Sequence, residues 1–208
     1  MSDKELYETS HTGYGHKNWI PLRNNQRTFV ASSNDINGSF TFEKTPILEP
    51  VGLISKLVVN PAIAQGKDGR YYLIVKGDKP GTTQLNQVIA VSDYPDRGFV
   101  IQLRPVIQDW NTEDMSMWWD EPTQKFYAVF HACTYLGMMT SSDGEKWEKA
   151  VDFEVMKKRI PLADGDTIVP DRLERPFVFI EDAKPRVFSS AVKKGNDAYI
   201  VFMPLKNH

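Results

Sequence analysis

The sequence has little cysteine, no long apolar run and no excess of charge of either sign. Each of these absences excludes a class of protein. A single cysteine, Cys133, excludes an intramolecular disulfide framework and a cysteine-based zinc cluster. No segment approaches the ~20 apolar residues that a membrane-spanning helix needs, and the first residues have no signal-peptide pattern. We therefore expect a soluble chain without a membrane partner, and we assign no compartment.

The charged residues are balanced: the chain has 25 Lys and Arg and 27 Asp and Glu, and its formal net charge is −2. Basic residues are scattered along the chain, which argues against a nucleic-acid partner. Walker loops, G-x-S-x-G elbows and C-x-x-C pairs are missing, so nucleotide hydrolysis, serine esterase chemistry and thiol redox chemistry have no support. We expect no metal or other cofactor. His11 and His16 have the spacing of a weak metal site but no third ligand, which favours a surface loop.

Helical periodicity is also weak. Proline and glycine are frequent, with 13 of each, and no long stretch keeps its apolar residues at helical spacing. Only the segment 149–159, KAVDFEVMKKR, could form one or two turns of helix. The chain is therefore expected to be an all-β protein, and its 208 residues predict a single domain over 1–208.

Short apolar strands that end in turn residues recur along the chain. Three stretches align without a gap: 29–40 (FVASSNDINGSF), 88–99 (VIAVSDYPDRGF) and 136–147 (LGMMTSSDGEKW). In each, a β-rich run meets Ser with Asp or Asn, a glycine-containing turn and then an aromatic residue. Asn, Asp and Gly tolerate the backbone angles of tight turns, so each stretch predicts a β-hairpin.

A second type of hairpin alternates with the first, at 60–77, 114–132 and 175–192. Two hairpins per unit give four strands, and a period of roughly 50–60 residues is typical of β-propeller blades. A β-sandwich is the alternative, since it also consists of many short strands. The fixed alternation of two hairpin types favours a propeller of four-stranded antiparallel blades.

Counting predicted blades gives an open ring. Residues 11–50 correspond to the outer half of one blade, 51–109 and 110–158 to full blades, and 165–208 to three strands of another. The chain thus provides about three and a half blades, and an unclosed propeller leaves sheet edges that invite association. We expect a homo-oligomer that closes these edges, or a truncated ring.

Several motifs carry a resemblance to a known family. NPAI, EDMSMWWD with KFYAVFH, LGMMTSSDGEKW, DRLERPFVFI and YIVFMPLK resemble the five-bladed β-propeller glycoside hydrolases of families 43 and 117, from about residue 27 onward. The resemblance implies a sugar-cleaving site at the starts of the innermost strands, with a base, a proton donor and a tuning carboxylate. It assigns two of these roles to Asp114 and Glu174. Asn60 holds the matching position of the preceding blade and cannot act as a base, so the resemblance implies a missing N-terminal blade.

The register of the hairpins does not select the catalytic acid by itself. Turn-to-turn counting makes Asn60, Asp114 and Arg175 equivalent, with Glu113 and Glu174 one residue earlier. Either Glu113 or Asp114 could face the cavity, and the resemblance favours Asp114. The alternative is that these carboxylates are solvated rim charges or ion-pair partners. A glycosidase needs two carboxyl groups, so we predict Asp114 and Glu174 as the catalytic pair.

Further residues are candidates for substrate binding, namely Asn60, Arg175, Lys76, His131 and Trp118. Lys76 could hold a carboxylate or sulfate of an acidic sugar, and His131 is either a site residue or a hydrogen-bonded core residue. Trp118 and Trp119 must point to opposite faces of one strand, so at most one is a sugar platform, and packing is the alternative for both.

The sequence therefore predicts a glycoside hydrolase-like protein that hydrolyses an oligosaccharide by carboxylate general acid/base catalysis, as in polysaccharide degradation. The alternative is a non-catalytic propeller that binds a carbohydrate or a protein and has lost its base. A third carboxylate opposite Asp114 and Glu174 would discriminate between the two.

Overall fold

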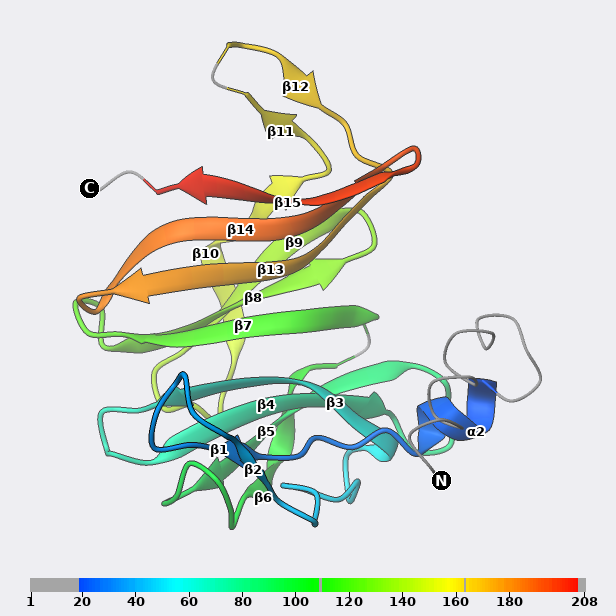
Figure 1. Ribbon diagram of the computed structural model, residues 1–208, viewed down its shortest axis with the longest axis vertical. Coiled ribbons are helices and arrows are strands. Elements are labelled where there is room, and N and C mark those ends of the chain that lie inside the picture. Colours follow the sequence, from blue (N-terminus) through cyan, green and yellow to red (C-terminus); the bar gives the residue numbers. More distant parts are fainter. Residues whose placement is uncertain (1–18, 109, 163, 206–208) are drawn as a thin grey trace.

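The computed structural model describes residues 19–108, 110–162 and 164–205, and these form three larger antiparallel β-sheets (Figure 1). The first sheet has four strands in sequence order. They are β3 (Ser55–Gln65), β4 (Tyr71–Asp78), β5 (Leu85–Ser92) and β6 (Val100–Ile107).

The second sheet also has four strands in sequence order, and the third has three. The second contains β7 (Thr112–Asp120), β8 (Lys125–Ala132), β9 (Tyr135–Ser141) and β10 (Glu148–Lys157). The third contains β13 (Arg172–Glu181), β14 (Lys184–Lys194) and β15 (Asp197–Pro204). The prediction of an all-β chain built from four-stranded antiparallel units is confirmed, and each predicted hairpin of the second type forms the first two strands of a sheet.

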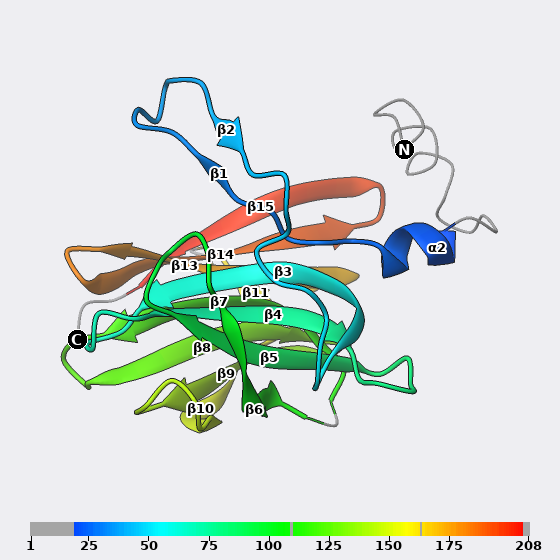
Figure 2. The same cartoon turned by 90° about the horizontal axis from the view of Figure 1, so that it is seen from below.

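Smaller elements surround these sheets. The strands β1 (Ala31–Ser32) and β2 (Thr41–Phe42) form one short hairpin, and β11 (Ile160–Pro161) and β12 (Thr167–Ile168) form another. The only helix in the described residues is α2 (Trp19–Asn24), which lies beside β3 (Figure 2). No described helix has the length and apolar character to cross a bilayer. Within the described part of 11–50, where half a blade was predicted, the only strands are those of the β1–β2 hairpin, and α2 precedes them.

The helical prediction for 149–159 is wrong. This segment falls in β10, which pairs with β9 through two register shifts. The shifts break the regular alternation of buried and exposed positions, so the sequence shows no strand period there. The helix α2 and the β11–β12 hairpin were not predicted.

The three sheets stack face to face, and apolar clusters fill the two spaces between them (Figure 1). The cluster between the first and second sheets contains Ile74, Ile89, Phe126 and Phe130. The cluster between the second and third sheets contains Val129, Leu136, Leu173 and Phe188. Successive positions of β8 thus serve opposite clusters, as strand geometry requires. This packing brings the innermost strands β3, β7 and β13 into contact, β3 with β7 and β7 with β13.

Candidate functional site

The three innermost strands share one backbone irregularity. Asn60, Asp114 and Arg175 have positive φ angles of 54°, 55° and 53°. Each lies at a register shift between its strand and the next one, between 59 and 62, 113 and 116, and 174 and 177. The predicted equivalence of these positions is therefore confirmed by their backbone. Left-handed non-glycine residues are uncommon and cluster at functional sites, where bulges aim a side chain.

The irregular positions line two cavities. The first, of about 630 Å³, runs along the innermost strands and is lined by Asn60, Asp114 and Arg175 together with neighbouring residues such as Met117 and Phe177. The second, of about 620 Å³, lies where these strands begin and is lined by Asn60, Arg175 and Glu113 among others. The bulge thus resolves the question that the register left open, because Asp114 faces the first cavity and Glu113 faces the second.

The Asp114 carboxylate is held in place on the cavity wall. It accepts a hydrogen bond from the Asn60 side-chain amide. Burial raises the pKa of Asp114, and the negative charge of Glu113 adds to this effect, while Arg175, Lys76 and His131 oppose it. The net direction is upward. Asp114 therefore holds a proton at higher pH than an ordinary aspartate, a property that suits an acid or a tuning carboxylate.

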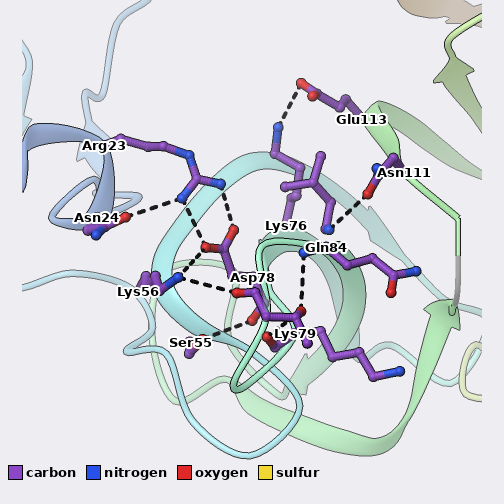
Figure 3. A network of polar contacts seen from close by, with 12 residues as sticks. Arg23, Asn24, Ser55, Lys56, Lys76, Asp78, Lys79, Gln84, Asn111 and Glu113 are labelled. Carbon is purple, nitrogen blue, oxygen red and sulfur yellow. Dashed lines mark hydrogen bonds and ion pairs between the residues drawn. The ribbon is translucent and has the colours of Figure 1, made fainter. Parts of the chain in front are cut away.

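Glu113 and Lys76 form an ion pair at the second cavity (Figure 3). The Lys76 ammonium lies 2.8 Å from Glu113 Oε2, and its side chain is only 8% exposed. Both residues line this cavity. Lys76 thus lies at the second cavity with its charge partly used by a protein carboxylate, and its role in substrate binding stays a prediction.

Glu174 occupies a different environment from Asp114. Its Oε1 accepts a hydrogen bond from Arg172 Nε at 2.7 Å, and its backbone carbonyl accepts one from the Ser190 hydroxyl at 2.6 Å. Neither of the two cavities is lined by Glu174 within the described residues. The structure therefore brings together Asn60, Asp114 and Arg175, and it leaves the Glu174 carboxylate beside Arg172.

His131 lies among the acidic residues of the site. It is on β8, paired across the sheet with Glu113. Burial lowers the pKa of its imidazole, and the charges of Glu174, Asp114 and Glu113 offset this only in part. The imidazole is thus mainly neutral near pH 7, and it is electrostatically linked to all three carboxylates.

Trp118 is placed for packing. Its ring stacks on Tyr127 with centroids 5.6 Å apart, and it joins the cluster between the second and third sheets. It does not line either cavity among the described residues. The predicted role as a sugar platform gains no support from this placement, and the packing alternative fits it. Trp119 packs on the opposite face, edge-on to Phe126 at 4.9 Å. The weak metal pair His11 and His16 lies outside the described residues.

Sequence reasoning missed the contribution of α2 to the site. Arg23 lines the second cavity and forms two hydrogen bonds, of 3.0 and 2.6 Å, with the carboxylate of Asp78 at the end of β4 (Figure 3). Asn111 lines the same cavity and accepts a hydrogen bond from the Leu85 backbone amide. No signal in the sequence pointed to Arg23, because its partner lies 55 residues away and the short helix has no periodicity to detect.

The described residues show no third carboxylate facing Asp114 across the first cavity. Its two equivalents are Asn60 and Arg175, an amide and a cation. Within the same residues, no group of three or more His, Cys, Asp or Glu is placed to hold a metal ion.

The chain is similar to known proteins in its structure, but no match was found from its sequence. No protein-family model matches the chain, and no curated protein matches it. Among solved structures, the chain is similar to CoXyl43, a GH43 β-xylosidase/α-arabinofuranosidase from a compost microbial metagenome in complex with xylotriose. The TM-score is 0.61 with 19% identity, covering 84% of this chain and 61% of that one.

Two further structures are similar. The GH43_1 enzyme from Xanthomonas citri, complexed with xylotriose, gives a TM-score of 0.62 with 14% identity over 84% of this chain and 60% of that one. A structure from the GH130 family of mannoside phosphorylases, which contains glycoside hydrolases that target β-1,2 mannosidic linkages, gives 0.59 with 16% identity over 82% and 52%.

These likenesses establish the fold. The chain has a GH43-like glycosidase fold and spans about three fifths of the length of the two GH43 structures. The resemblance to family 43 is thus confirmed at the level of the fold, while the likeness to family 117 stays a prediction.

Proposed function

We propose that this chain is a glycoside hydrolase-like protein that binds an oligosaccharide in the first cavity and takes part in hydrolysing its glycosidic bonds. The observation that carries the proposal is the position of Asp114. Its side chain lines a cavity of a GH43-like fold from a left-handed position on an innermost strand, and its pKa is raised. Two structural neighbours hold xylotriose, which supports an oligosaccharide as the ligand class here.

Glycosidic cleavage uses one carboxyl group to protonate the leaving oxygen and another to activate water or attack the sugar. We assign proton donation to Glu174 and the tuning of that step to Asp114. For Glu174 to reach a leaving oxygen, its carboxyl must turn away from Arg172, which donates a hydrogen bond to it at 2.7 Å. We assign His131 a supporting role, since the charges of both acids act on its imidazole.

The general base in this proposal comes from a further blade. Asn60, the equivalent of Asp114 in the first sheet, has no proton-accepting carboxylate. We propose a five-bladed ring of which the described sheets are about three and a half blades. The remaining one and a half blades, contributed by a further polypeptide segment or a partner, would supply the base opposite Asp114.

Turnover of nitrophenyl β-D-xyloside and nitrophenyl α-L-arabinofuranoside tests this proposal. Replacing Glu174 with Gln should lower kcat by about 10²–10⁴-fold, since it removes the proton donor while keeping the shape of the side chain. The matched control is Glu148→Gln, on the exposed side of β10, which should leave turnover unchanged. Circular dichroism would show that both variants stay folded. Unchanged turnover by the Glu174 variant would remove this residue from the mechanism.

A non-catalytic binding protein is the second candidate, and a specific observation favours it. The two positions equivalent to Asp114 hold Asn60 and Arg175, which can bind a sugar but cannot act as a catalytic base. Calorimetry with xylotriose distinguishes the candidates. Binding without turnover by the unsubstituted chain would favour the second one.

A further inference from the structure

The second cavity is rich in positive charge. Its volume is about 620 Å³, and the cations that line it are Arg23, Lys76 and Arg175. Glu113 is the one carboxylate among the described residues lining it. The whole chain has a formal net charge of −2, so this local excess of cations does not reflect a generally basic protein.

Arg23, the cation from α2, is only partly neutralised by its carboxylate partner. Asp78, whose side chain is 0% exposed, is shared by Arg23 and by Lys56, whose ammonium lies 3.1 Å from Asp78 Oδ2 (Figure 3). Two cations around one carboxylate leave one positive charge. Because Asp78 is fully buried and Arg23 is partly exposed, the positive side of this group faces the cavity.

The other two cations differ in how far they are neutralised. Lys76 is paired with Glu113 at 2.8 Å, so this pair adds no net charge. Arg175 is exposed and lines both cavities, and its left-handed backbone fixes where its side chain starts. The charge of Arg175 acts on Asp114, which is neutral when it is protonated. Counted together with Asp78 and Lys56 behind the wall, the groups at this cavity carry a net positive charge of at least one.

Guanidinium groups are well suited to binding anions. Arginine binds a carboxylate or a sulfate through two parallel hydrogen bonds, and such charge-assisted bonds are roughly twice as strong as neutral ones. A partly enclosed cavity strengthens them further, because solvent screens the charges less than on an open surface. Asn60 and Asn111, which also line the cavity, provide amide groups of the kind that bind sugar hydroxyls.

We infer that this cavity selects an acidic sugar, a glycan unit that carries a carboxylate or sulfate group bound by Arg175 and supported by Arg23 and Lys76. The inference rests on the proposed function, because it takes the adjoining cavities as one oligosaccharide site. It adds the class of substrate to that proposal.

Binding of a matched pair of glycosides to the full chain tests the inference. Nitrophenyl β-D-glucuronide and nitrophenyl β-D-glucoside differ only in a carboxylate in place of a hydroxymethyl group. Calorimetry should give a Kd about 10-fold lower for the glucuronide, consistent with one charge-assisted contact. The difference should shrink in 0.5 M NaCl. Nitrophenyl glucoside 6-sulfate distinguishes a sulfate-binding cavity from a carboxylate-binding one.

Two variants connect the preference to the cavity. In Arg175→Gln the ratio of the two Kd values should fall to about one, whatever the absolute affinity of the variant for either glycoside. The matched control is Arg104→Gln, an exposed position on β6 that lines neither cavity. It removes the same charge and should keep the full preference.

The outcomes separate the inference from the proposed function. Equal binding of charged and neutral glycosides would overturn the inference and leave the proposed function intact. Equal competition by sodium acetate or sodium sulfate alone would also overturn it, because the site would then recognise an anion without its sugar. If none of these glycosides binds, the inference fails, and the proposed function fails with it only if xylotriose does not bind either.

Discussion

The first and third sheets pack on opposite faces of the second sheet, yet their own outer faces differ. Residues 47–54, which precede β3, cover the outer face of the first sheet. Leu48 and Ile54 pack there against the buried side chains Val58, Leu73, Val75, Val88 and Ala90. The third sheet has no such cover among the described residues, and its most exposed apolar side chains are Phe177, Phe179, Ile200 and Phe202.

The sequence of the third sheet is that of a sheet covered on both faces, although its outer face is uncovered. Its strands are apolar on both faces, a pattern typical of strands that are covered on both sides. Phe177 and Phe202 each pair with Ser189 across the sheet, so they share one row of side chains on the same face. This face of the third sheet is open, and the opposite face packs against the second sheet. The third sheet is thus stabilised from one side, whereas the first sheet is buried from both, and their stabilities should be unequal.

Two matched leucine substitutions should have the largest effects and test whether the two sheets differ in stability. Leu73 in the first sheet and Leu173 in the third are both almost fully buried. Replacing either with Ala should lower the free energy of unfolding by about 2–5 kcal/mol, because it removes buried methyl groups and leaves a cavity. Urea denaturation followed by tryptophan fluorescence measures this loss.

The two variants should differ in which strands open. Hydrogen exchange should show that Leu173→Ala opens β13–β15 locally while the first sheet stays protected. In Leu73→Ala, exchange should rise in both outer sheets together, as expected for global unfolding. If the third sheet were as protected as the first in both variants, the inequality of the two sheets would be wrong.

A smaller effect is expected at Asp78, which ties α2 to the first sheet. Replacing Asp78 with Asn keeps the shape but removes the ion pairs with Arg23 and Lys56. The loss should be about 1.5–3 kcal/mol, the range for hydrogen bonds to charged groups, since both cations are partly exposed and can be hydrated. Thermal unfolding at pH 7 measures it. Asp152→Asn, on β10, is the control with an unchanged midpoint.

The stability difference between the unsubstituted chain and Asp78→Asn should depend on pH in a defined direction. Burial alone would raise the pKa of Asp78, but the hydrogen bonds from Arg23 and Lys56 outweigh it and lower the pKa. The folded state therefore favours the ionised form. Its stabilisation is complete above the unfolded pKa of about 3.9 and is lost as the pH falls through the lower folded value. The gap between wild type and Asp78→Asn should hold from pH 7 to about 5 and close below about 4.

The sheets could be predicted from the sequence because their signals are local. Each hairpin carries its own turn residues, and the alternation of two hairpin types gives the order of the strands. The segment 149–159 misled the prediction because the register shifts of β10 hide its strand period. The helix α2 was missed because six residues carry almost no periodic signal.

The site could be predicted only in part. Counting from turn to turn identified Asn60, Asp114 and Arg175 as equivalent, but whether residue 113 or 114 faced the first cavity depended on a bulge that the sequence does not reveal. Arg23 comes from an element far along the chain, so its place at the cavity is a product of tertiary packing. The contact of Glu174 with Arg172, two residues away, agrees with the alternative that these carboxylates are ion-pair partners.

The smallest effect on stability, and the sharpest test of the open face, is expected at Phe202. It is 70% exposed, so Phe202→Lys should change the free energy of unfolding by no more than about 0.5 kcal/mol. We predict that this face associates with another copy of the chain, because exposed apolar patches of this kind mark interaction sites. A lysine there should therefore shift the sedimentation coefficient at high protein concentration toward that of the monomer.

The control for this substitution lies on the first sheet. Leu103, on β6, is 95% exposed but stands outside the apolar row of the third sheet. Leu103→Lys adds the same charge and should leave self-association unchanged, because a single exposed apolar residue is ordinary and a contiguous row is not. If both lysines reduced association equally, the effect would not depend on the open face of the third sheet. The open face of the third sheet would then have no special role, and the difference between the two sheets would concern stability alone.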